Sequence, residues 1–123
     1  MNALLAASAA VAALLAIGHV TGGTRFVLRP MMETSFDPIA KRTMLFVWHL
    51  STLLLFMTAA GLGYAAARDE TGPLALYLVV QSLALAAIQF TTGATSGIPG
   101  WIYKMPQWAV FALVGGLAAA PLL

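Results

Sequence analysis

The sequence predicts an all-α integral membrane protein, a four-helix transmembrane bundle with up-down-up-down topology, formed by a single domain over residues 1–123. Of the 123 residues, 61% are hydrophobic and only 8% are charged, whereas a soluble domain has about 25% charged residues. Four apolar segments each approach the roughly 20 residues that cross a bilayer core. A chain with so little charge cannot cover a water-facing surface, so we expect the lipid bilayer to surround it and expect no nucleic-acid binding.

The first helix is expected over residues 3–22, where alanine and leucine dominate. No Lys or Arg precedes this segment, and it is longer than the apolar core of a usual signal peptide, so we interpret it as an uncleaved transmembrane helix. Gly22-Gly23 is a natural stop signal for a helix. The sequence therefore predicts that the first helix ends there.

The second helix is expected over residues 38–67, because Asp37 can cap its N-terminus and Pro38 suits the first helical position. Prolines also open the third and fourth helices, expected over residues 73–93 and 105–122. Helices are expected because every backbone amide inside lipid needs a partner, and no alternating pattern suggests a barrel.

The basic residues predict the orientation. One Lys or Arg lies between the second and third helices, whereas the other two connections hold five. By the positive-inside rule those two connections face the cytoplasm and both termini lie on the opposite, non-cytoplasmic side. We expect the inner (plasma) membrane of a bacterium, with headgroup contacts from the first connection. Its basic residues are Arg25, Arg29, Lys41 and Arg42.

A layer of polar side chains is expected near the cytoplasmic face. His19 lies near the end of the first helix and His49 lies at a similar depth in the second. The same level is reached by Thr52, Gln89 and Thr92. Three interpretations stay open: hydrogen bonds between helices, a polar route for ions or protons, and binding of haem or a metal. Two histidines are too few for a closed zinc site, so no cofactor is assigned.

Glycines predict close packing of helices. Gly18 and Gly22 form one GxxxG pair, Gly93 and Gly97 form another, and Gly63 belongs to a face of small residues on the second helix. Small residues let two helix backbones approach closely. We expect packing within the bundle, with self-association as the alternative.

The sequence contains no catalytic motif and no cysteine. We therefore expect a non-enzymatic protein, a structural or accessory subunit that acts through helix packing in a membrane complex. The alternatives are a small oligomeric transporter or channel that uses the polar layer, and haem or metal binding by His19 and His49.

Overall fold

The computed structural model describes residues 1–123 and contains helices but no strand, which confirms the all-helical prediction. The N-terminal helix Ala3–Glu33 is continuous and combines α1 (Ala3–Gly18), a π-helical segment η1 (His19–Leu28) and α2 (Arg29–Glu33). The others are α3 (Pro38–Arg68), α4 (Pro73–Ala94), the single turn α5 (Trp101–Lys104), α6 (Gln107–Ala119) and the 3₁₀ turn η2 (Ala120–Leu122).

Three helices are long and apolar enough to cross a membrane: Ala3–Glu33, Pro38–Arg68 and Pro73–Ala94. The apolar helix Gln107–Leu122 is shorter, because the backbone breaks at Met105, where φ is −129° and ψ is 62°. These lengths and the apolar composition support a membrane protein.

The first helix does not end at Gly22-Gly23, so this prediction was wrong. The chain continues as a π-helix through His19–Leu28 and reaches Glu33. A glycine that ends a helix adopts a left-handed backbone conformation. Gly22 and Gly23 do not adopt it, since the glycines with positive φ are Gly97 and Gly100. Arg25 and Arg29 therefore lie on a helix rather than in a loop.

Two helix starts coincide with the positions expected from local sequence. α3 begins at Pro38, and the Oδ1 atom of Asp37 accepts a hydrogen bond from the Ala40 amide at 2.9 Å. α3 ends at Arg68, followed by Asp69 in the left-handed conformation with φ of 54°. α4 begins at Pro73.

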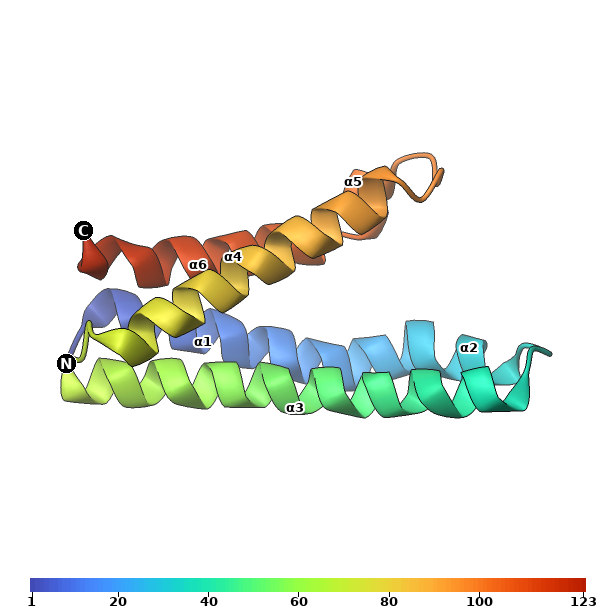
Figure 1. The fold of residues 1–123 in the computed structure, drawn as a ribbon, viewed down its shortest axis with the longest axis horizontal. Helices are drawn as coiled ribbons and strands as arrows, with labels where there is room; N and C mark the ends of the chain where they lie inside the picture. Colours follow the sequence, from blue (N-terminus) through green and yellow to red (C-terminus); the bar gives the residue numbers. More distant parts are fainter.

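The helices pack as two pairs, α1 with α3 and α4 with α6 (Figure 1). The pairs come together at the end that carries both chain termini, where α1 also packs against α6, and they diverge toward the other end. A buried apolar cluster, which includes Leu5, Leu62, Leu78 and Val114, fills the joined end. The divergent end has no comparable core.

Two hydrogen bonds from side chains join neighbouring helices away from the divergent end. The Ser8 hydroxyl donates to the Val114 carbonyl at 2.8 Å and joins α1 to α6. The Gln81 amide donates to the Thr58 hydroxyl at 2.7 Å and joins α4 to α3. In a membrane such bonds contribute about 0.6 kcal/mol on average.

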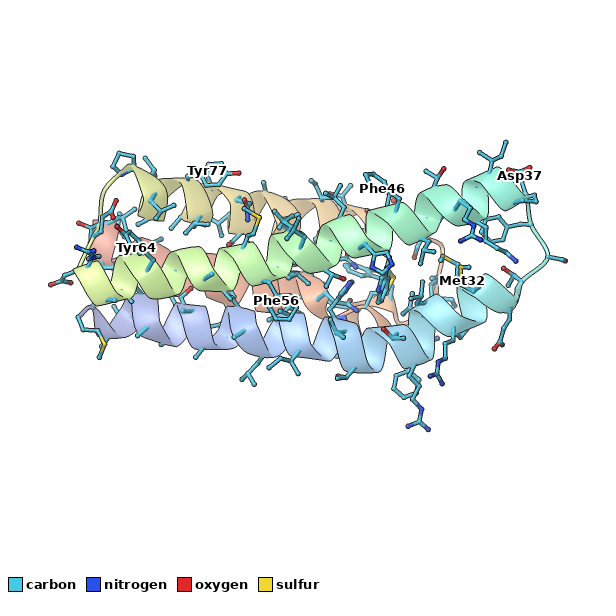
Figure 2. The ribbon with its side chains drawn as sticks, turned by 90° about the horizontal axis from the view of Figure 1, so that it is seen from below. Met32, Asp37, Phe46, Phe56, Tyr64 and Tyr77 are labelled. Carbon is cyan, nitrogen blue, oxygen red and sulfur yellow. The ribbon has the colours of Figure 1, made fainter.

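The outer surface is rich in large apolar side chains. Only 18 of 123 residues are buried. Figure 2 shows Phe46 and Phe56 on α3 and Tyr77 on α4, all of them exposed. A surface of this kind suits contact with lipid or with other membrane helices.

Candidate functional site

A cavity of about 790 Å³ lies between the pair formed by the N-terminal helix and α3 and the pair formed by α4 and α6. Of its 20 lining residues 14 are hydrophobic, and they come from the N-terminal helix, α3, α4 and α6. Its polar side chains are His19, Ser51, Gln89 and Gln107, and no Lys, Arg, Asp or Glu contributes to the walls. The volume is within the range of about 300–1,000 Å³ that is usual for ligand pockets.

One wall of the cavity is a stack of two aromatic rings. The rings of His19 and Trp48 are almost parallel, at 20°, with their centroids 4.0 Å apart. Gly23, one turn after His19, allows this arrangement: a Cβ atom added there would lie 2.7 Å from Cη2 of Trp48. The glycine expected to stop the helix instead admits the Trp48 indole.

The Nε2 atom of His19 is buried and has no hydrogen-bond partner. Leaving a buried polar atom unpaired costs about 1–3 kcal/mol. The Nε1 atom of Trp108 is also buried and unpaired, but Trp108 does not line the cavity and packs edge-on against Phe90 at 5.4 Å. Although the His19 residue lines the cavity, its Nε2 atom has almost no accessible surface and is not open to that space.

The two histidines do not share the cavity. His49 is exposed and absent from the walls, although its neighbour Trp48 lines them. Successive residues of a helix point about 100° apart, which places the Trp48 and His49 side chains on different faces of α3. The structure contains no group of three or more His, Asp or Glu residues that could hold a metal ion.

The remaining residues of the expected polar layer are divided. Gln89 lines the cavity, whereas Thr52 and Thr92 do not. The Thr52 hydroxyl donates to the Trp48 carbonyl of its own helix at 2.9 Å, and Thr92 is exposed. Equal depth did not bring these side chains together.

Sequence reasoning missed the part played by Trp48 and Gly23. The signal was present, because His19 and Gly23 are four residues apart and share one helix face. The apolar walls, such as Met31 and Met44, had no distinguishing signal in a chain where most residues are hydrophobic.

The four basic residues expected at the lipid headgroups lie on the N-terminal helix and the first turns of α3. Arg25 is exposed, and its guanidinium is 5.3 Å from the centre of the Phe26 ring. Arg29 and Arg42 are also exposed. Lys41 instead donates from Nζ to the Met32 carbonyl at 2.9 Å and ties α3 to the N-terminal helix. This is the end of the molecule that carries Met32 and Asp37 in Figure 2.

Most of the expected packing glycines have no packing partner within the chain. A Cβ atom on Gly18, Gly22, Gly63 or Gly97 would meet nothing within 4 Å. The expectation that these four glycines pack against other helices of the bundle was therefore wrong. Gly93 is covered by the Trp101 ring, as expected of a packing glycine. The other closely packed glycines are Gly23, Gly61 and Gly115.

Comparison with protein-family models, curated proteins and solved structures gives no match for this chain. The function must therefore be inferred from the residues and their geometry.

Proposed function

We propose that this protein is a non-enzymatic accessory subunit of a bacterial inner-membrane complex, built as four membrane-crossing helices with both termini on the non-cytoplasmic side. The observation that supports this role is a strip of small residues that no other part of the chain covers. The strip comprises Ala60, Gly63 and Ala67 on α3: the two alanines are exposed, and a Cβ atom on Gly63 would meet nothing within 4 Å.

Small uncovered residues favour association because lipid tails are as apolar as leucine, so helices gain from close packing rather than from leaving water. Phe56 and Tyr64 are exposed beside the strip and offer large side chains for a neighbouring helix. The face is thus suited to a second transmembrane helix.

The test is extraction in mild detergent at native abundance, followed by identification of stoichiometric partners. Gly63→Leu should reduce co-purification of the partner, since it blocks close approach. Gly116→Leu is the matched control, because Gly116 on α6 is also open and lies outside the strip. A protein that runs alone as a monomer or small homo-oligomer contradicts the proposal.

The orientation can be tested directly because the chain has no cysteine. Single variants Thr34→Cys and Leu123→Cys place a thiol at each end of the molecule. A membrane-impermeant maleimide added to intact spheroplasts should label Leu123→Cys, and should label Thr34→Cys only after permeabilisation. Labelling of Thr34→Cys from outside would reverse the proposed topology.

A small oligomeric transporter is the second candidate, favoured by the cavity between the helix pairs. A bundle of four helices leaves little room for a pore, so this function needs at least two copies. It predicts proton flux into proteoliposomes, reported by trapped pyranine, that is lost in His19→Phe. Flux equal to that of protein-free vesicles removes this candidate.

A further inference from the structure

We propose that the end of the molecule formed by residues 25–46, which we call the hairpin tip, binds the phosphate groups of anionic phospholipids through Arg25, Arg29 and Arg42. The proposal requires a membrane protein but not the accessory role or the orientation proposed for it.

The hairpin tip extends beyond the pair formed by α4 and α6 (Figure 1). α3 has 31 residues and α4 has 22, which at 1.5 Å per residue corresponds to lengths of about 46 and 33 Å. A short turn after Arg68 joins the two helices, so they meet at one membrane surface. α4 matches a hydrocarbon core of about 30 Å, and the excess length of α3 therefore lies in the hairpin tip.

Contacts between the N-terminal helix and α3 place Arg29 and Arg42 at the same level. The Nζ atom of Lys41 bonds to the Met32 carbonyl, and a Cβ on Gly23 would meet the Trp48 ring. Between these two contacts the helices run antiparallel, so residues 29 and 42 lie within about 3 Å of each other along the helix axes.

This level corresponds to the lipid headgroups. If the outer edge of the core lies at Arg68, about 20 residues of α3 cross it and Arg42 lies about 9 Å beyond the inner edge. The headgroup region adds about 5–8 Å on each side of the core. The long arginine side chains reach the phosphates from there.

Charge is ordered along the hairpin tip as a phosphate layer requires. Arg25, Arg29 and Arg42 are exposed. Glu33 and Asp37 follow farther from the membrane, at the end that carries Asp37 in Figure 2. An anionic surface attracts the nearer cations, and its field decays before the carboxylates. We leave Lys41 out of the site, because its ammonium already bonds to the Met32 carbonyl.

Exposed aromatic rings lie on the membrane side of these cations. Phe46 is one turn closer to the membrane than Arg42, and the two residues line a shallow hollow of about 510 Å³ on α3. Phe26 follows Arg25 and is 71% exposed. A phospholipid fits this order, with phosphate on the guanidinium groups and acyl chains against the rings. An acidic protein segment in water would leave the rings unused.

Native mass spectrometry of the purified protein in a neutral detergent tests the preference. Phosphatidylglycerol and phosphatidylcholine with identical acyl chains are titrated, and the bound peaks give a dissociation constant for each lipid. Phosphatidylglycerol should bind at least about tenfold more tightly, since each cation near an anionic surface contributes about a factor of five. Equal binding of the two lipids overturns the proposal.

Single variants locate the site. Arg25→Gln, Arg29→Gln and Arg42→Gln should each weaken phosphatidylglycerol about fivefold and leave phosphatidylcholine unchanged. The triple Arg→Lys variant should keep most of the preference, because it keeps the charge. Arg68→Gln is the matched control, since Arg68 is exposed at the other end of α3. A loss as large in Arg68→Gln as at the hairpin tip, or no loss at the hairpin tip, contradicts the site.

Glycerol 3-phosphate separates a lipid from a soluble phosphate compound. It carries the charged group without acyl chains, so a large excess should not displace phosphatidylglycerol. Displacement would assign the arginines to a soluble phosphate compound and overturn the assignment of a lipid.

Discussion

Gly23→Ala tests the contact that carries the N-terminal helix past its expected end. In a helix interior, alanine is favoured over glycine by about 1 kcal/mol. The new Cβ would lie 2.7 Å from Cη2 of Trp48. If the indole stays in place, the overpacking destabilises the protein by about 1–3 kcal/mol. If the indole moves, it loses its stack on His19, which is worth about 0.5–1.5 kcal/mol. Gly23→Ala should therefore range from about 0.5 kcal/mol stabilising to about 2 kcal/mol destabilising.

Gly22→Ala is the matched comparison, because a Cβ atom at Gly22 meets nothing within 4 Å. It should stabilise by about 1 kcal/mol, so the two alanine variants should differ by about 0.5–3 kcal/mol. The assay is reversible unfolding by sodium dodecyl sulfate, followed by circular dichroism. In a Trp48→Phe background the difference should shrink. A Gly23→Ala protein as stable as Gly22→Ala would refute the packing of Trp48 against Gly23.

Three further predictions use the same unfolding assay. Ser8→Ala removes the hydroxyl that donates to the Val114 carbonyl and should cost about 0.6 kcal/mol, and at most about 1.7; a gain in stability would contradict a role for this bond. A double-mutant cycle of Gln81→Met and Thr58→Val should give a coupling energy of about 0.6 kcal/mol, because the two wild-type side chains share a 2.7 Å hydrogen bond. If the stability changes of the two single variants simply add in the double variant, the bond contributes nothing. Asp37→Ala should lower the stability by about 0.5–2 kcal/mol because it removes the N-cap of α3. Asp37→Asn should be nearly as stable as wild type. Equal losses of stability in both variants would show that the charge of Asp37 matters rather than its capping hydrogen bond.

The inside of the bundle shows why depth alone did not locate the site. Position along a helix fixes how deep a side chain lies, but rotation about the helix axis decides whether it faces inward. His19 and His49 were placed at similar depth from the sequence, yet only His19 lines the cavity. Side-chain hydrogen bonds between helices formed instead through Ser8, Gln81 and Lys41, outside the polar layer that was expected from the sequence.

The sequence by itself determined that the chain is helical and rich in membrane-length apolar segments, because composition and the need to satisfy backbone amides act on every residue alike. It also located the start of α3, since the Asp37 cap is a contact over three residues. The tertiary structure alone decided that the first helix continues past Gly22-Gly23 and that Gly23 receives Trp48 from α3. The physical reason is that a glycine pair permits a stop without requiring one, and a partner twenty-five residues away along the chain determines which outcome forms.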